Sequence, residues 1–126
     1  MSWPAARAAL DARMAALPSL GASKIAWPNV ALATQTALYY VVAFLPATVN
    51  PPLSGGNDHE QGIYQVSVFA PAGAGLGPAL VQAQAVADHF NRQNLSGISC
   101  GVPTLAPALI EPDWVHIPVS IPFICL

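Results

Sequence analysis

Apolar and polar positions alternate along this chain with two different periods, and the change of period marks where strands give way to helices. A period of two places successive side chains on opposite faces of a strand, whereas a period near 3.6 gathers them along one face of a helix. The period of two is clearest between Trp114 and Phe123, where Val, Ile and Phe fall on every second position. We therefore expect a strand over residues 113–126.

A second strand, a glycine-rich loop and a helix follow one another between residues 59 and 92. The strand of residues 59–71 places four apolar residues on one face: Tyr64, Val66, Val68 and Ala70. The helix of residues 78–92 has an apolar stripe formed by Ala79, Ala83, Val86 and Phe90 and widened by Leu80 and Ala87. Pro78 suits the first turn of this helix, where a missing N–H costs nothing.

The remaining segments predict four further elements and one turn. Residues 3–17 form an alanine-rich helix that ends before Pro18, and residues 24–27 form a short strand. Residues 36–45 are apolar on both faces, so we expect that strand to be central or covered on both sides. Residues 97–105 are expected to form a strand that contains a glycine and a proline, and residues 106–112 a turn.

The last strand contains two prolines at positions of the same parity, Pro118 and Pro122. Their missing N–H groups would point to the same side of the strand, where they cannot contribute to a ladder. We expect this strand to be an edge of the sheet, or to be bordered on that side by something other than a regular strand. The candidate interface on this strand consists of Trp114, His116, Pro118 and Pro122.

These elements predict an α+β fold, in which a mostly antiparallel mixed β-sheet of four to five strands is covered by two α-helices. At 126 residues, the chain is expected to form a single domain over residues 1–126. We find no internal repeat and no low-complexity tail.

The composition favours association with other proteins. Only 8% of the residues are charged and 54% are hydrophobic, whereas ordinary soluble domains are about 25% charged. The longest unbroken apolar run, residues 37–45, is less than half of the roughly 20 residues that a membrane-spanning helix needs. The charges spread through residues 1–17 do not resemble a signal peptide. We therefore expect no membrane association, and oligomerisation as the way in which apolar surface is covered.

The net charge of −2 and the four basic residues provide no surface for specific nucleic-acid binding. Cys100 and Cys125 fall in predicted strands and are expected to be buried thiols. A disulfide between them would require the two strands to pair.

A long turn-rich connection, residues 47–61, is the candidate functional loop. Loops of about 12–15 residues without secondary structure of their own are often functional. Its charged residues are acidic, and no basic residue occurs between Ile25 and Ala87. The loop's candidate interface residues are Asn50, Asn57, Asp58, His59 and Glu60.

The sequence predicts no catalytic residue, no metal site and no cofactor. His59 with Asp58 and Glu60 could suggest a metal or acid–base cluster, but consecutive loop residues point in different directions. The glycine loop of residues 73–77 suggests a phosphate site, yet it continues into Pro78 and fits neither the Walker nor the Rossmann spacing. A small-ligand-binding domain or an enzyme that uses this loop is the alternative of a different class.

Taken together, several segments resemble the tail terminator-like proteins of long, non-contractile phage tails and prophages. They are an alanine-rich opening helix, 25–29 (Ile-Ala-Trp-Pro-Asn), 62–68 (Gly-Ile-Tyr-Gln-Val-Ser-Val), 71–75, 87–90 (Ala-Asp-His-Phe) and 114–121. The resemblance covers nearly the whole chain. In one departure, the loop before Gly62 lacks the arginine or lysine expected near it in many relatives.

The resemblance implies a small α+β domain without enzymatic activity that assembles as a hexameric ring on the finished tail tube, stops tube growth and presents a surface for head joining. It implies as partners other copies of the chain, the tail tube protein and a head–tail connector protein. The implied location is the virion tail, and the host cytoplasm during assembly. Another head–tail joining protein of similar fold is the closest alternative.

Overall fold

The computed structural model describes residues 3–17, 25–27, 38–46, 61–73, 76–95 and 97–125. Its elements are two helices, α1 (Trp3–Ala15) and α2 (Gly77–Phe90), and the strands β1 (Ile25–Ala26), β2 (Tyr39–Pro46), β3 (Gln61–Pro71), β4 (Asn94–Leu95), β5 (Ile98–Cys100), β6 (Thr104–Leu105), β7 (Leu109–Ile110) and β8 (Trp114–Cys125). The three long strands and both helices lie where the periodicity predicts them.

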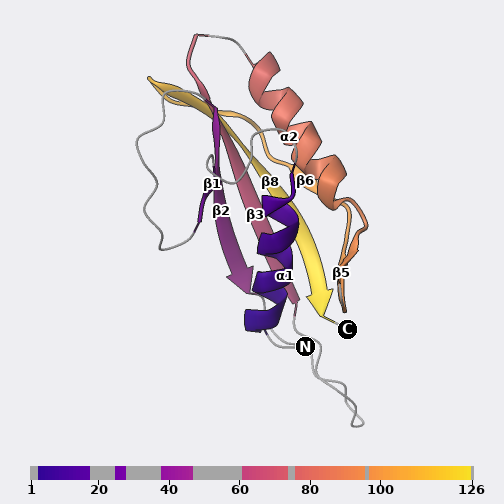
Figure 1. Ribbon diagram of the computed structural model, residues 1–126. Coiled ribbons are helices and arrows are strands. Elements are labelled where there is room, and N and C mark those ends of the chain that lie inside the picture. The colour runs from indigo at the N-terminus through magenta and orange to yellow at the C-terminus, as the bar shows by residue number, and fades with distance from the viewer. Residues whose placement is uncertain are drawn as a thin grey trace.

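One sheet contains all the strands, in the order β1-β2-β3-β8-β5-β4, and β6 and β7 also pair with β8 (Figure 1). Its centre is the antiparallel pair of β3 and β8, which are in register along all 11 residues of β3. β2 pairs with the other side of β3 in antiparallel fashion, and β1 is parallel to β2. The sheet is therefore mixed but almost entirely antiparallel.

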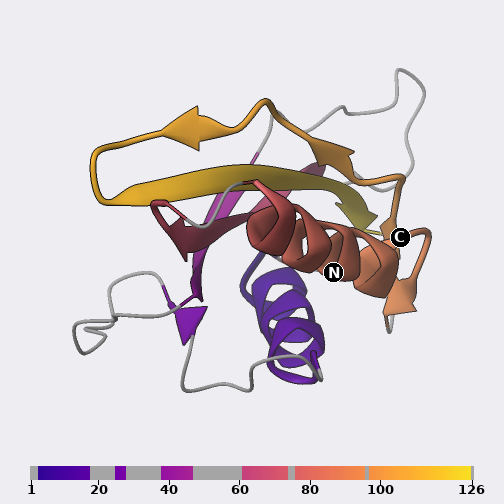
Figure 2. The same cartoon turned by 90° about the horizontal axis from the view of Figure 1, so that it is seen from above.

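Both helices cover the same face of the sheet (Figure 2). The residues predicted for the apolar face of β3, Tyr64 to Ala70 at every second position, are at most 1% exposed. α1 contributes Ala6, Leu10 and Met14 to the core, and α2 contributes the predicted Ala79, Ala83, Val86, Ala87 and Phe90. The structure is thus a two-layer domain, and no described helix lies on the opposite face of the sheet.

Hydrogen bonds between distant segments fix the helix layer. The Tyr64 hydroxyl donates to Asp11 Oδ1 of α1 at 2.6 Å, and the Tyr40 hydroxyl donates to Gln82 Oε1 of α2 at 3.0 Å. The Arg13 guanidinium donates to the carbonyl oxygen of His89 at 2.8 and 3.0 Å. His89 Nε2 lies 2.7 Å from the carbonyl oxygen of Arg13, and since a carbonyl can only accept, Nε2 carries the hydrogen. The two helices are therefore joined reciprocally.

The two prolines of β8 do not lie on an edge strand, so the first interpretation of the Trp114–Pro122 segment is wrong, whereas the alternative, a border other than a regular strand, agrees with the structure. β8 pairs with β3 on one side and with three short strands, β5, β6 and β7, on the other. The carbonyl oxygens of Pro118 and Pro122 face these short strands and accept from Ala106 N at 2.9 Å and Gly101 N at 2.8 Å. The missing N–H groups face the same side, as their shared parity predicts.

The neighbouring chain is interrupted where it passes these prolines. Cys100 lies opposite Phe123, whereas Thr104 lies opposite Ser120, so the break between β5 and β6 holds one residue more than the facing stretch of β8. The break between β6 and β7 likewise holds one extra residue, since Leu109 lies opposite His116. Each break is a bulge beside a proline that cannot donate a hydrogen bond.

This interruption also corrects the predicted strand number. The sheet has eight strands rather than four to five, although the α+β class and the two helices are as expected. The predicted single strand of residues 97–105 is divided into β5 and β6, and the predicted turn of residues 106–112 contains β7. β4 precedes them. Prolines and glycines in residues 97–112 divide the chain beside β8 into short strands.

One prediction of burial differs from the structure, and two others can be refined. Leu80, expected in the buried stripe of α2, is 45% exposed. β2, expected to be central or covered on both sides, lies between β1 and β3, but only one of its faces is buried, and Leu45 on the other is 45% exposed. Cys100 and Cys125 are buried thiols on paired strands, with no disulfide between them. Neither faces the other, because Cys100 lies opposite Phe123 and Cys125 opposite Ile98.

We expect Gly62→Ala to destabilise the protein by about 2 kcal/mol, because it overpacks the core. An added Cβ at Gly62 would lie 2.5 Å from the carbonyl oxygen of Leu45 and 3.1 Å from the Phe123 ring. The matched control is Gly77→Ala at the start of α2, where an added Cβ meets nothing within 4 Å. Urea unfolding of both variants measures the difference. Equal free energies of unfolding for the two variants would show that the close approach of β2 to Gly62 on β3 does not require a glycine there.

Candidate functional site

The face of the sheet opposite the helices has an aromatic corner, which we define as Tyr39, Phe69, Trp114 and His116. The Tyr39 and Phe69 rings stack with centroids 5.1 Å apart, and Trp114 meets Tyr39 edge-on at 5.1 Å. The His116 ring lies 4.5 Å from that of Phe69. The rings come from neighbouring strands because β2, β3 and β8 place these residues side by side. Ring-on-ring contact leaves no space for a ligand between them.

A carboxylate borders this corner. Glu111 Oε1 lies 3.4 Å from His116 Nδ1, and the Glu111 side chain is 52% exposed. Burial raises the pKa of the Tyr39 hydroxyl above its ordinary value, and the negative charge of Glu111 adds to the increase. The corner is therefore an aromatic surface with an acidic rim.

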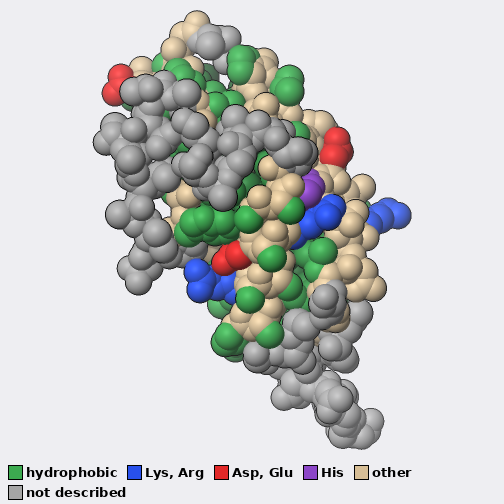
Figure 3. Space-filling model, viewed as in Figure 1, with side chains coloured by type: hydrophobic (Ala, Val, Ile, Leu, Met, Phe, Trp, Pro, Cys, Tyr) green, Lys and Arg blue, Asp and Glu red, His purple; other side chains and the backbone are tan. Residues whose placement is uncertain are grey.

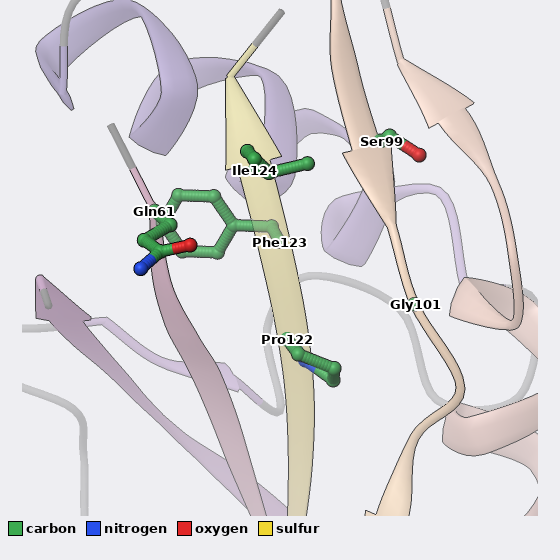
Figure 4. A pocket seen from close by; sticks show the side chains of 6 residues that line it. All are labelled: Gln61, Ser99, Gly101, Pro122, Phe123 and Ile124. Atoms are coloured by element: carbon green, nitrogen blue, oxygen red, sulfur yellow. The ribbon is translucent and has the colours of Figure 1, made fainter. Parts of the chain in front are cut away.

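The other end of β8 borders a shallow hollow, which we call the sheet-end hollow (Figure 4). Its volume is about 320 Å³, and it is lined by Gln61, Ser99, Gly101, Pro122, Phe123 and Ile124. Gly101 permits this close packing, since an added Cβ would lie 3.0 Å from the Pro122 ring. The lining contains no charged residue, so it cannot hold an ionic ligand by an ion pair.

The four predicted interface residues of β8 separate into different environments. Trp114 and His116 belong to the aromatic corner, Pro118 is buried, and Pro122 is exposed beside the sheet-end hollow. They share one face of one strand, as the alternation predicts. Their role in an interface stays a prediction.

The predicted loop residues Asn50, Asn57, Asp58, His59 and Glu60 lie outside the described residues. Part of the glycine loop, residues 74 and 75, also lies outside them. The interpretations that depend on these residues stay predictions.

Besides Leu45 and Ile63, which face each other on β2 and β3, the described chain exposes two groups of large apolar side chains. Leu76, Leu80 and Val81 are 46%, 45% and 64% exposed at the start of α2. Val102, Leu109 and Ile110 are 53%, 51% and 82% exposed on the interrupted edge. The sequence did offer one indication of the second group, because Leu109 and Ile110 are large apolar residues within the predicted turn of residues 106–112. Large apolar residues this exposed mark candidate protein contacts.

A second hollow, the α2 hollow, lies between α2 and the interrupted edge. It has a volume of about 170 Å³ and is lined by Gln84, Ala87, Asp88, Asn91, Val102, Pro103 and Leu105. A larger and more open depression of about 440 Å³ lies beside it on α2, lined by Gly77, Leu80, Val81 and Gln84. Both are open to the surface.

Blue, red and purple side chains are visible among hydrophobic ones on the face that carries α1 (Figure 3). Arg7 Nε lies 3.4 Å from Asp11 Oδ2, and the same carboxylate group accepts the Tyr64 hydroxyl. Asp88 accepts a hydrogen bond from Gln84 at 2.8 Å. These contacts lie within the helix layer or between it and the sheet, and they do not converge on one site.

Three described groups, Cys100, Tyr64 and Tyr40, hold their protons more tightly than usual. Burial raises the pKa of the Cys100 thiol to about 11, so little thiolate exists near neutral pH. Burial also raises the pKa of Tyr64, assisted by its bond to Asp11, and raises that of Tyr40 to about 12. Within the described ranges, no group of three or more His, Cys, Asp or Glu residues could hold a metal ion.

None of the described helices is both long enough and apolar enough to cross a membrane.

The described residues form a small α+β domain with exposed apolar side chains on α2 and on the interrupted edge. Residues 5–123 match the family described as phage tail terminator protein, so the chain belongs to the phage tail terminator family. This family consists of structural components of the phage tail, which interact with other tail components.

Comparison with solved structures gives the same architecture. One similar structure has a TM-score of 0.75 and 21% sequence identity, and the match covers 100% of this chain and 96% of that one. At this identity the similarity shows the fold. No curated protein sequence matches the chain.

We expect the free energy of unfolding to fall as the pH rises above about 9, because buried phenols and a buried thiol keep their protons in the folded state. Cys100 and Tyr40 have ordinary pKa values of 9.0 and 10.0, and both are raised in the fold. Above these ordinary values the unfolded chain loses protons that the folded chain retains, so alkali favours unfolding.

Urea unfolding between pH 8 and pH 11 measures this dependence. Tyr40→Phe is expected to reduce the alkaline slope, since it removes one of the groups that titrate only on unfolding. Stability that is unchanged up to pH 11 would contradict the burial of these groups.

Proposed function

We propose that this chain caps the tail tube as a ring, ends tail polymerisation and provides the surface to which the head joins. The family match over residues 5–123 is the observation that carries this proposal. The ring is a hexamer on the tail, and its neighbours are the tail tube protein on one side and a head–tail connector protein on the other.

The character of the surface supports an assembled state. The described chain exposes eight large apolar side chains by 39% or more, and one face of its sheet is not covered by a described helix. A protein with a net charge of −2 and so much exposed apolar surface gains stability from contact with other copies. Contacts between different patches of identical subunits close into rings when the rotation between neighbours permits.

The acidic loop before β3 is proposed to lie at the lumen or on an axial face of the ring. Asp58 and Glu60 are its charged residues. DNA passes through the end of a tail tube, and a neutral or acidic lining does not retain phosphates, whereas lysine or arginine would. The lack of basic residues in this loop fits such a position.

We further propose that the chain performs no reaction. Burial raises the pKa of Cys100 and of Tyr64, which suits groups that pack in a core rather than react. The exposed hollows are lined mainly by apolar and uncharged side chains, with Asp88 the one charged residue among them.

In a phage that encodes this chain, deletion of its gene is expected to give tails of abnormal and variable length that fail to join heads. Without the cap, addition of tube protein has no defined end. Electron microscopy of the particles measures tail length, and the wild-type gene supplied in trans is the control that restores the normal length. A normal length distribution without the chain would refute the terminator role.

Replacing Asp58 and Glu60 by lysine is expected to impair DNA release while leaving the fold intact, because lysines at the lumen would attract phosphates. The control places lysines at Ala8 and Ala12, which are exposed on α1. Counts of assembled particles and the rate of DNA ejection distinguish the two variants. If neither measurement differs from the control, the loop does not lie at the lumen or axial face.

A further inference from the structure

The α2 hollow has a polar side and an apolar side, which come from two different segments. On the polar side, Gln84, Asp88 and Asn91 are spaced four and three residues apart, so they lie on one face of α2 and its C-terminal end. The apolar side consists of Val102, Pro103 and Leu105, at and before β6, which lies beside α2 (Figure 1). A ligand in the hollow would therefore meet hydrogen-bonding groups on one side and apolar groups on the other.

The charge of the hollow is negative. Asp88 is the one charged residue among the described residues that line it. Asp88 Oδ1 accepts a hydrogen bond from Gln84 Nε2 at 2.8 Å, which orients the carboxylate beside the hollow. The bond uses the amide nitrogen of Gln84, so Asp88 Oδ2 and the Gln84 carbonyl oxygen remain as acceptors. The polar side is thus suited to a positively charged donor.

A lysine side chain matches both sides of the hollow. Its methylene stem can lie against the apolar side while its ammonium group remains at the polar, solvated side. The ammonium group has three donors and no acceptor, which suits a site that offers acceptors. Arginine binds a carboxylate best through two parallel N–H bonds, but Gln84 already donates to one oxygen of Asp88. The arrangement therefore favours lysine over arginine.

This chain is a poor source of such a cation. It has four basic residues in 126. Arg7 lies 3.4 Å from Asp11, and Arg13 donates to the carbonyl oxygen of His89, so both are engaged within the chain. Arg92 directly follows Asn91 but is not among the residues that line the hollow. A different protein is a better source of the lysine than a second copy.

We propose that the α2 hollow is a docking site for a lysine side chain of a different protein, with Asp88 paired to the ammonium group. The inference is independent of the proposed function, since neither a ring nor a place in the tail enters the argument. An exposed ion pair contributes little affinity, so Asp88 selects the side chain and further contacts have to hold the partner.

The depression beside the hollow provides such contacts. It is lined by Gly77, Leu80, Val81 and Gln84, so the two features share Gln84. Leu80 and Val81 are 45% and 64% exposed. The partner surface that fits both features presents a lysine next to apolar side chains.

An NMR titration of the full-length protein with Nα-acetyl-lysine N-methylamide tests the proposal. At low salt we expect saturable shifts of the backbone amides of Gln84, Asp88, Asn91 and Val102, with a Kd on the order of 10 mM, as befits a single side chain. The norleucine analogue keeps an apolar stem but lacks the ammonium group, and it should bind about fivefold more weakly.

Two variants separate the effect of Asp88 from that of net charge. Asp88→Asn keeps the size of the side chain and should abolish the difference between the two analogues, because it removes the charge that distinguishes them. Asp113→Asn removes the same charge from an exposed position that does not line the hollow, and it should preserve the difference. Both residues are exposed, so both variants are expected to fold.

The proposal is overturned if the wild-type protein binds the two analogues equally or shows no saturable shift, a comparison that requires no variant. Equal effects of Asp88→Asn and Asp113→Asn, or tighter binding of the arginine analogue, would overturn it as well. Shifts of the same amides with protein concentration alone would assign the hollow to a second copy instead. Because none of these measurements involves tails, a negative result leaves the proposed function standing.

Discussion

The antiparallel ladder between β3 and β8 is the constraint on which the rest of the structure depends. β8 contains two prolines whose missing N–H groups face one side, so a continuous ladder can form only on the other. β3 occupies that side along its full length. The side with the prolines accepts a chain interrupted by two bulges, and this interruption produces both the α2 hollow and the protruding β7–β8 turn.

The second determinant is that both helices cover one face. Tyr64 contacts α1 through Asp11 and lies 5.7 Å from the Phe90 ring of α2, so a single strand anchors both helices. The opposite face then has to be stabilised without a described helical cover. It achieves this at one end by stacking aromatic rings across three strands, which buries apolar area within the sheet surface itself. The result is a domain in which both helices cover one face of the sheet and no described helix covers the other.

The core faces of β3, β8 and α2 could be predicted from the sequence because each depends on a pattern within one continuous segment. The alternation along β3 and β8 and the stripe of α2 identified nearly all of their core positions, and the shared parity of Pro118 and Pro122 identified the side on which pairing fails. The shared parity of the two prolines could not distinguish a missing neighbouring strand from an interrupted one, since in both cases no hydrogen bond from the proline nitrogen is needed. The strand number was therefore underestimated.

Other features depended on contacts between distant segments. Leu80 lies at the border of the α2 stripe, and only the position of the interrupted edge decides whether such a residue is covered. The reciprocal bonds of Arg13 and His89 join residues that no sequence period relates. The aromatic corner likewise appears only when the register of three strands is known. The exposure of Ile110 was not predicted, because it lies in a segment that was expected to be a turn.

The order of the strands along the chain also affects how the protein is made. β3 emerges from the ribosome well before β8, with α2 and four short strands between them, so its long ladder must wait for the final strand. Until then the apolar face of β3 and its unpaired edge lack their partner, and a ladder between strands so distant in sequence is slow to form. The nascent chain is therefore most prone to aggregation in the interval between the synthesis of β3 and that of β8.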